Sequence, residues 1–431
     1  MIVRTTHISP AKPFEIQLDH IAADKSISHR CAILSLLSDK PSYIQNYLLG
    51  EDTLHTLDIA KQLGLEVETL ANNQMKFTPP KKGLQEPDNI LDCGNSGTAI
   101  RLYTGLLSGQ KGYFVLSGDI YLRSRPMQRV INPLEDIGAK IYARKENSLA
   151  PITIIGKKLK HFSYKSPISS AQVKSAMILA ALNTNEISDY TEPALSRDHT
   201  ENMLKGMGAN IISAEEKIQI SPLIHPLTPL NLCIPADPSS AFFFALAGAI
   251  IPNSKILLKN VLLNKTRIEA FEILKKMGTH IEYTTTNQDY ESIGDIYVEQ
   301  RPLQSIVIEK NISWLIDELP ALSIAMAMAK GRSEVKNAQE LRVKESDRIK
   351  AVIHNLIQMG IECQEYEDGY TIQGGELKPA LIESFGDHRI AMSFAIAGLI
   401  CGAKIKDSGC IDVSFPNFLK LLEKLTKIHN T

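Results

Sequence analysis

The sequence predicts an α/β protein of repeated units divided into two domains. Polar openings before small-residue apolar helices recur at separations of 68 to 81 residues, near Lys25, Ser96, Ser170, Ser239, Pro320 and His388. A glycine that ends a helix before a strand-like run recurs at Gly64, Gly138, Gly208, Gly278 and Gly360. Such spacing indicates repeated units, and glycine suits the left-handed residue that closes a helix. The 431 residues also exceed what one hydrophobic core commonly serves.

The composition is consistent with a large soluble enzyme, which we expect in the cytoplasm. With 47 basic and 48 acidic residues the net charge is −1, which argues against a nucleic-acid-binding surface or a polybasic membrane anchor. No secretory signal begins the chain, and the longest apolar helices, 241–251 and 391–400, are too short to cross a bilayer. The six cysteines form no Cys-x-x-Cys pair and the histidines have no ligand spacing, so we expect reduced thiols, no metal and no cofactor.

The N-terminal segment predicts strands over residues 2–18, interrupted by Pro10 and Pro13, followed by an apolar helix. Lys25, Ser26 and Arg30 fall at the start of that helix, where free N–H groups and the helix dipole favour an anion. In the alternative interpretation Ser26 is an ordinary cap and the two cations are solvated. The anion interpretation is favoured because cations at a helix start oppose the dipole.

The polar residues before the next apolar helix, and the loop that follows this helix, provide hydrogen-bond donors and cations. Residues 94–98 combine two glycines with Asn95 and two hydroxyls, and a loop stiffened by Pro126 carries Arg123 and Arg125. Glycine lets backbone approach a ligand, and arginine offers a planar fork for carboxylate or phosphate. Each pattern is weak evidence when taken alone.

Further along, serines open another helix and a charged loop follows it. Ser169 or Ser170 caps the helix that contains Gln172, and capping is the simpler interpretation of both serines. Arg197 is either a partner of its neighbour Asp198 or an anion ligand. Residues 235–240, with a proline on each side of an aspartate, predict a hinge between halves.

The stretch from Asp317 to Arg348 is the most informative. Acidic residues stand before a small-residue helix, and alternating cations and carboxylates follow in residues 342–348. Lys344 and Glu345 in a solvated helical face with i,i+4 pairs would be the ordinary interpretation. Recurrence of the same construction along the chain favours a site for a charged substrate.

Together these motifs resemble the 5-enolpyruvylshikimate-3-phosphate synthases, the enolpyruvyl transferases of the shikimate pathway. The resemblance spans essentially the whole chain and comprises eight ordered motifs. They are Asp-Lys-Ser-x-Ser-x-Arg at 24–30, Gly-Asn-Ser-Gly-Thr at 94–98, Arg-Pro-Met at 125–127, Ser-Ala-Gln-Val-Lys-Ser at 170–175, Ser-Arg-Asp-His-Thr-Glu at 196–201, Asp-Glu-x-Pro at 317–320, Arg-Val-Lys-Glu-Ser-Asp-Arg at 342–348 and Asp-His-Arg-x-Ala-Met at 387–392.

The resemblance implies a two-domain enolpyruvyl transferase fold, in which each domain has three βαβαββ-like units and buried helices converge on an interdomain cleft. Residues 1–19 and 237–431 would form a discontinuous domain with the acid/base and phosphoenolpyruvate residues. Residues 20–236 would form an inserted domain with the shikimate-phosphate residues. The cleft is expected to close when shikimate 3-phosphate binds.

The resemblance also implies the reaction and its residues. The enolpyruvyl group of phosphoenolpyruvate would pass to the 5-hydroxyl of shikimate 3-phosphate by addition and elimination, on the route to chorismate and the aromatic amino acids. The implied catalytic residues are Asp317, Glu345 and Lys25. Those for shikimate 3-phosphate are Lys25, Ser26, Arg30, Ser169, Ser170, Ala171, Gln172, Arg197, Asp317 and Lys344. Those for phosphoenolpyruvate are Lys25, Asn95, Gly97, Arg125, Gln172, Arg348 and Arg389.

In this hypothesis Asp317 takes the proton of the attacking hydroxyl, and Glu345, helped by Lys25, protonates the methylene carbon. The family expectation is a monomer, and Gly97 is the small residue that usually leaves room for the inhibitor glyphosate. Val413 stands where some relatives carry lysine.

Two alternatives compete with this interpretation: the closest competing enzyme, and a protein of a different class. The UDP-N-acetylglucosamine enolpyruvyl transferases share the fold but carry a reactive cysteine in the loop that matches residues 118–127, where this chain has none. Repeats can also build a non-catalytic scaffold, against which the intact Asp317, Lys344 and Glu345 argue.

Overall fold

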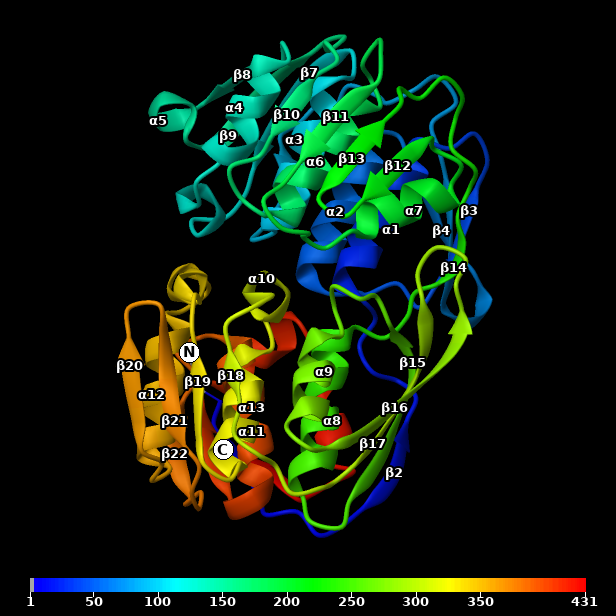
Figure 1. Cartoon of the computed structure of the whole chain (residues 1–431). Helices are drawn as coiled ribbons and strands as arrows, with labels where there is room; N and C mark the ends of the chain where they lie inside the picture. The colour runs from blue at the N-terminus through cyan, green and yellow to red at the C-terminus, as the bar shows by residue number, and fades with distance from the viewer. Residues whose placement is uncertain (1–3) are drawn as a thin grey trace. The chain divides into compact units, whose positions relative to one another are not determined.

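The computed structural model describes residues 4–431, which form two compact units (Figure 1). Unit 1 comprises the chain through Ala22, Pro235–Gln288 and Ser292–Thr431, and unit 2 comprises Ala23–Ile234 with Asp289–Glu291. The domain limits expected from the resemblance, at residues 19/20 and 236/237, stay predictions. Residues 2 and 3 of the predicted N-terminal strands lie outside the described residues.

Unit 2 contains three four-stranded sheets with the orders β6-β7-β9-β8, β10-β11-β13-β12 and β14-β3-β5-β4. Its strands are β3 (Ser42–Gln45), β4 (Glu66–Thr69), β5 (Gln74–Thr78), β6 (Leu91–Asp92), β7 (Gly112–Ser117), β8 (Lys140–Ala143), β9 (Leu149–Gly156), β10 (Ser163–Lys165), β11 (Ser188–Thr191), β12 (Ile211–Ala214), β13 (Lys217–Ile220) and β14 (Asn231–Cys233). Its main helices are α1 (Lys25–Ser35), α2 (Glu51–Gln62), α3 (Gly97–Ser108), α4 (Gln128–Asp136), α6 (Ala171–Ala181) and α7 (His199–Gly206).

Unit 1 also contains three four-stranded sheets, with the orders β16-β17-β15-β2, β18-β19-β21-β20 and β22-β23-β1-β24. Its strands are β1 (Thr6–Ile8), β2 (Glu15–Leu18), β15 (Lys255–Leu262), β16 (His280–Asn287), β17 (Ile293–Glu299), β18 (Val307–Ile308), β19 (Arg332–Val335), β20 (Cys363–Tyr366), β21 (Gly369–Gln373), β22 (Ala380–Glu383), β23 (Ala403–Lys406) and β24 (Ile428–Asn430). Its helices are α8 (Pro238–Ile250), α9 (Glu269–Lys276), α10 (Ile312–Leu315), α11 (Leu319–Met328), α12 (Arg348–Gln358), α13 (His388–Cys401) and α14 (Phe418–Leu422).

All six sheets share one pattern, in which a parallel pair of strands is followed by two antiparallel pairs. A helix connects the strands of the parallel pair in β6–α3–β7 and β18–α11–β19, and a second helix precedes the closing hairpin. These are the βαβαββ units that the resemblance implied, three in each unit, and the predicted fold class is confirmed.

The predicted helix openings are confirmed as the starts of α1, α3, α6, α8, α11 and α13. In five of these helices a side chain caps the first turn by accepting from a backbone N–H: Asp24, Ser96, Ser170, Asp237 and Asp387. An acceptor at this position satisfies a donor that has no partner within the helix. The sequence therefore specifies each helix start locally.

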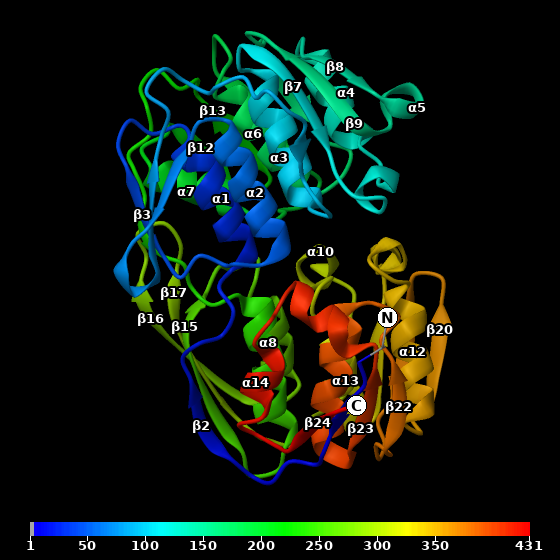
Figure 2. The same cartoon turned by 180° about the vertical axis from the view of Figure 1, so that it is seen from behind.

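The six helices with predicted starts are almost wholly buried and form the centre of each unit. In unit 2, α3 packs on α6, and in unit 1, α8, α11 and α13 contact one another. Figure 2 shows α8 and α13 of unit 1 between the strands β15–β17 on one side and β22 and β23 on the other. A helix that is apolar all round must be covered on all sides, which explains why sheets surround them.

The helix-closing glycines are confirmed by the backbone. Gly64, Gly138, Gly208, Gly278 and Gly360 all have positive φ, between 84° and 118°. Each follows α2, α4, α7, α9 or α12 by two residues and turns the chain towards the next strand.

None of the six cysteines forms a disulfide in the structure, and the reduced state of the thiols stays a prediction. Over residues 4–431, no helix combines the length and the apolar character that spanning a membrane requires.

Candidate active site

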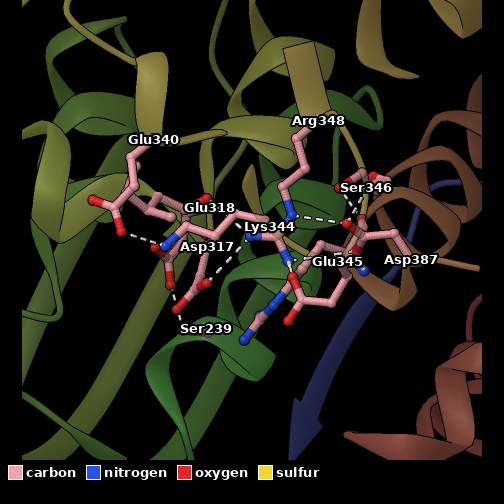
Figure 3. Close-up of polar contacts among 12 residues, drawn as sticks. Ser239, Asp317, Glu318, Glu340, Lys344, Glu345, Ser346, Arg348 and Asp387 are labelled. Carbon is pink, nitrogen blue, oxygen red and sulfur yellow. Dashed lines mark hydrogen bonds and ion pairs between the residues drawn. The ribbon is translucent and has the colours of Figure 1, made fainter. Parts of the chain in front are cut away.

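Arg348 gathers three carboxylates in unit 1, and Figure 3 shows them around its guanidinium. Its Nε donates to Asp387 Oδ2 at 2.9 Å, its Nη2 to Glu345 Oε2 at 2.6 Å and its Nη1 to Asp317 Oδ1 at 3.4 Å. The side chain of Arg348 is 1% exposed. Asp317 and Glu345 therefore lie on the two Nη atoms of one buried cation.

These contacts shift the pKa values of the groups involved. Burial alone would lower the pKa of Arg348, but Asp387, Glu345 and Asp317 outweigh burial and raise it. Burial would raise the pKa of Glu345, but Arg348 and His388 lower it below its usual value. The same holds for Asp387, whose pKa Arg348 lowers against the effect of burial. All three groups are charged at neutral pH.

The two acidic residues before α11 have different surroundings. Glu318 is 2% exposed and accepts from Ser239 of α8, whereas the side chain of Asp317 is 26% exposed. Arg267 donates to Ser239 Oγ at 3.1 Å and to Asp237 Oδ1 at 2.8 Å. Glu318 is thus part of a buried network that fixes the start of α11, and Asp317 is the carboxylate that solvent reaches.

Lys344 does not belong to a solvated helical face. It lies between a short 3₁₀ turn (Gln339–Val343) and α12, with an extended backbone. Its Nζ donates to Glu340 Oε1 at 2.5 Å, and Figure 3 shows this pair beside Asp317. The alternative interpretation, a solvated helical face, therefore does not hold for Lys344.

The start of α13 completes the group in unit 1. Asp387 caps the helix by accepting from Arg389 N at 2.8 Å and also accepts from Ser346 Oγ at 3.0 Å. Burial, and then the charge of Arg389, lower the pKa of His388 to about 4. The Arg389 guanidinium lies 6.0 Å from the ring centroid of Phe243, within cation–π range.

In unit 2, Lys25 and Asp52 form an ion pair between the starts of α1 and α2. Behind them His29, which is fully buried, shares a hydrogen bond of 2.6 Å with Thr56 Oγ1. Burial and the neighbouring Lys25 lower the pKa of His29 to about 3. His29 is therefore neutral at physiological pH. The positive charge at the first residue of α1 comes from Lys25.

Arg30, one turn further along α1, is held by two other helices. Its Nε donates to Thr200 Oγ1 of α7 at 2.8 Å, and its Nη2 donates to Ser175 Oγ of α6 at 2.9 Å. Its Nη1 donates to Ser26 O at 3.0 Å. A guanidinium has five N–H groups, so each Nη keeps a second N–H.

Gly97, Arg125 and Gln172, three of the phosphoenolpyruvate residues expected in unit 2, lie around Arg101 of α3. Its Nη1 donates to Gln172 Oε1 at 2.5 Å, and Gln172 Nε2 donates to Thr98 Oγ1 at 3.1 Å. A Cβ added at Gly97 would lie 2.7 Å from Arg101 Nη1 and 3.2 Å from Arg125 Nη1. Burial, and then the charges of Arg129 and Arg125, lower the pKa of Arg101 to about 9.

Arg125 is itself tied to the same turn, because its Nη2 donates to Asn95 Oδ1 at 2.6 Å. Gly97, Asn95, Gln172 and Arg125 therefore lie together in unit 2.

The serines before α6 have different partners. Ser170 caps the helix by accepting from Val173 N, whereas Ser169 Oγ accepts from Ala194 N at 2.9 Å. Ala171 is the first residue of α6. Ser169 thus connects this helix start to the loop before α7, which carries Arg197.

Two residues of these groups were missed from the sequence. Arg101 follows Gly97 by four residues and therefore lies on the same face of α3, a spacing that could have revealed it. Asp52 gave no such indication, because its pairing with Lys25 depends on how α1 packs against α2.

One group of side chains has the composition of a metal site. Ligand atoms of Asp198, His199 and Glu291 lie within 4.8 Å of one another. However, His199 Nδ1 and Glu291 Oε1 are hydrogen-bonded at 2.7 Å, and Asn202 Nδ2 donates to Glu291 Oε2 at 3.3 Å. Hydrogen bonding accounts for this geometry, and we assign no metal to it.

Comparison with known proteins gives one consistent result. Residues 9–422 match the family model described as EPSP synthase (3-phosphoshikimate 1-carboxyvinyltransferase). The chain belongs to the EPSP synthase family.

Curated relatives agree over nearly the full length. The 3-phosphoshikimate 1-carboxyvinyltransferase of Wolinella succinogenes is 60% identical over 99% of this chain and 98% of its own. That of Helicobacter hepaticus is 55% identical over 99% of both chains. The solved structure of EPSP synthase from Acinetobacter baumannii has a TM-score of 0.91 at 36% identity, with both chains fully covered. The predicted family and enzyme class, an enolpyruvyl transferase of the shikimate pathway, are confirmed.

Proposed function

We propose that this member of the EPSP synthase family transfers the enolpyruvyl group of phosphoenolpyruvate to the 5-hydroxyl of shikimate 3-phosphate with Asp317 and Glu345 as its acid/base pair. The observation that carries the proposal is that both carboxylates contact the same Arg348 guanidinium. Addition followed by elimination needs one group for the attacking hydroxyl and another for the methylene carbon. Two carboxylates around one fixed cation meet this requirement.

Asp317 acts as the base. It is the more exposed member of the acidic pair before α11, and its Oδ1 lies 3.4 Å from Arg348 Nη1. It takes the proton of the 5-hydroxyl as that oxygen attacks C2 of phosphoenolpyruvate.

Glu345 donates a proton to the methylene carbon and later recovers one. Its pKa is low because Arg348 lies 2.6 Å away, so it must lose that partner before it can act as an acid. We propose that the anionic groups of phosphoenolpyruvate take over this N–H of Arg348. Glu345 then loses its main stabilising contact and its pKa rises, so that it takes up a proton only when the substrate is bound.

The other predicted residues hold the substrates. Ser169, Ser170 and Arg197 hold the phosphate of shikimate 3-phosphate, and Lys25, Ser26, Arg30, Asp317 and Lys344 meet its ring hydroxyls and carboxylate. Ala171 and Gln172 also bind this substrate. Asn95, Gly97, Arg125 and Gln172 bind phosphoenolpyruvate together with Lys25, Arg348 and Arg389. Two anions repel one another unless fixed cations compensate them, and one unit-charge pair at about 4 Å contributes roughly 4 kcal/mol at an effective dielectric of 20.

Charge-removing variants test the acid/base assignment. Asp317→Asn and Glu345→Gln keep the side-chain shape, and each should lower kcat about 10²- to 10⁴-fold with a much smaller change in KM. The exposed Glu376→Gln, in the loop between β21 and β22, is the matched control. Near-normal turnover in both site variants would refute the assignment.

Substrate identity is tested by phosphate release from phosphoenolpyruvate in three mixtures: with shikimate 3-phosphate, with UDP-N-acetylglucosamine and with neither. Release with shikimate 3-phosphate alone is the expected result. Release only with the nucleotide sugar would indicate the other enolpyruvyl transferase, and absence of release would support a non-catalytic role.

The proposal extends to the inhibitor glyphosate, to a monomeric state and to the cytoplasm. A methyl group added at Gly97 would lie 2.7 Å from Arg101 Nη1 and 3.2 Å from Arg125 Nη1, closer than an ordinary contact. Glyphosate should therefore inhibit the wild type at lower concentration than it inhibits Gly97→Ala, and equal dose-response curves would contradict this. Sedimentation velocity tests the monomer.

A further inference from the structure

Three charged side chains are buried together in unit 2, outside the proposed catalytic groups. Lys174 Nζ of α6 lies 2.8 Å from Glu192 Oε1 and 2.9 Å from Glu201 Oε1 of α7. The side chains are 0% exposed for Lys174 and 1% exposed for each glutamate. Buried charge is costly and gives only weak stabilisation even when paired, so the cluster calls for a role other than stability.

The cluster fixes the residue that precedes Arg197. Lys174 Nζ donates to Ser196 O at 3.0 Å, and Ser196 N donates to Glu192 Oε1 at 2.8 Å. Both backbone groups of Ser196 are therefore bound to buried, charged partners. Hydrogen bonds of this kind are about twice as strong as neutral ones, and they restrict the direction in which Arg197 leaves the loop.

A second layer of contacts connects the cluster to Arg30. Ser175 and Thr200, the chain neighbours of Lys174 and Glu201, share a hydrogen bond of 2.7 Å. The same two hydroxyls accept from Arg30. The ion pair between Lys174 and Glu201 thus holds together the two helices that orient Arg30.

The charges of the two layers are also complementary. One lysine faces two glutamates, and in the described part of the chain Glu192 Oε2 and Glu201 Oε2 have no hydrogen-bond partner. The negative charge of Glu201 also acts on Arg30. Glu201 therefore acts on Lys174 and on Arg30 together.

We infer that Lys174, Glu192 and Glu201 are positioning residues for shikimate 3-phosphate, which act by presenting Arg197 and Arg30. This inference rests on the proposed binding roles of those two arginines. It does not involve Arg125, Gln172 or the other phosphoenolpyruvate residues. The predicted consequence is a selective effect on one substrate.

The test compares KM for the two substrates in Glu192→Gln, Glu201→Gln and Lys174→Met, with Lys174→Arg as the conservative variant. Each of the first three should raise KM for shikimate 3-phosphate about tenfold or more, the loss that one charge-assisted hydrogen bond represents. KM for phosphoenolpyruvate and kcat should stay within about threefold, and Lys174→Arg should recover part of the loss. Ser323→Ala, which removes a buried hydrogen bond to Tyr370 in unit 1, is the control that should change neither KM.

Equal increases in both KM values, or a shikimate 3-phosphate KM within twofold of wild type in all three variants, would overturn the inference. If Lys174→Met does not fold, Glu192→Gln and Glu201→Gln still test the inference.

Arg197→Gln, measured in the same assay, distinguishes failure of the proposed binding role of Arg197 from failure of the positioning role of the cluster. If it leaves the KM for shikimate 3-phosphate unchanged, the proposed role of Arg197 fails; if it alone raises that KM, only the cluster inference fails.

Discussion

Gly97→Ala should weaken phosphoenolpyruvate binding through Arg101. The added Cβ would lie 2.7 Å from Arg101 Nη1, so the guanidinium must move by about 0.7 Å to reach an ordinary contact of 3.4 Å. That nitrogen donates to Gln172 Oε1 at 2.5 Å, and a hydrogen bond to a charged group contributes about 1.5–3 kcal/mol. Loss of most of this contact corresponds to an increase of about tenfold or more in the KM for phosphoenolpyruvate.

A double-mutant cycle in a steady-state phosphate-release assay tests the cause. In an Arg101→Met background the nearer nitrogen is absent and only the 3.2 Å contact with Arg125 Nη1 remains, so Gly97→Ala should raise KM clearly less than it does in the wild type. Gly409→Ala is the control, because an added Cβ there meets no atom within 4 Å. The reasoning is refuted if Gly97→Ala raises KM equally in both backgrounds or leaves it unchanged in the wild type.

Two further predictions concern stability. Arg348→Met leaves Asp317, Glu345 and Asp387 without their shared cation, so it should lower the free energy of unfolding by about 3–5 kcal/mol in urea denaturation. The exposed Arg301→Met is its control, and a loss below about 1 kcal/mol would contradict the prediction. The pKa of His29 is lowered from 6.5 to about 3, so below pH 6.5 the unfolded chain takes up a proton that the folded chain refuses. Wild type should therefore lose stability relative to His29→Gln by up to about 1.4 kcal/mol per pH unit as the pH falls from 6.5. A difference in stability that does not change with pH would contradict this.

The helix starts and ends could be predicted because their determinants are local. Asp24, Ser96 and Asp387 cap helices from the adjacent position, and Gly64 and Gly278 close helices with positive φ. Caps and left-handed glycines depend on residues within one turn. The repeat could therefore be found by spacing alone.

The strand partners at the ends of each unit could not be predicted in this way. β14 (Asn231–Cys233) pairs with β3 (Ser42–Gln45), and β1 (Thr6–Ile8) lies between β23 and β24. In each of these two sheets, strands from near the beginning of a unit's sequence pair with strands from near its end. A local sequence pattern cannot predict such a pairing.

In the candidate site, too, the sequence identified many of the residues but not the contacts between them. The residues that the resemblance indicated include Arg348, but its three carboxylate partners come from three separate segments. The ion pair of Lys25 with Asp52 and the contact of Arg101 with Gln172 depend on helix packing. Sequence motifs thus identify reactive groups, whereas tertiary structure decides which cation controls which carboxylate.

The most direct test of the proposed chemistry is the exchange of hydrogen at the methylene carbon of phosphoenolpyruvate. Wild-type enzyme, shikimate 3-phosphate and phosphoenolpyruvate incubated in deuterated water should give deuterium in recovered phosphoenolpyruvate, measured by mass spectrometry. Glu345→Gln should slow this exchange by about 10²-fold or more while calorimetry shows binding of shikimate 3-phosphate within a few fold of wild type. Exchange at the wild-type rate in Glu345→Gln would contradict the assignment of Glu345 as the group that protonates carbon.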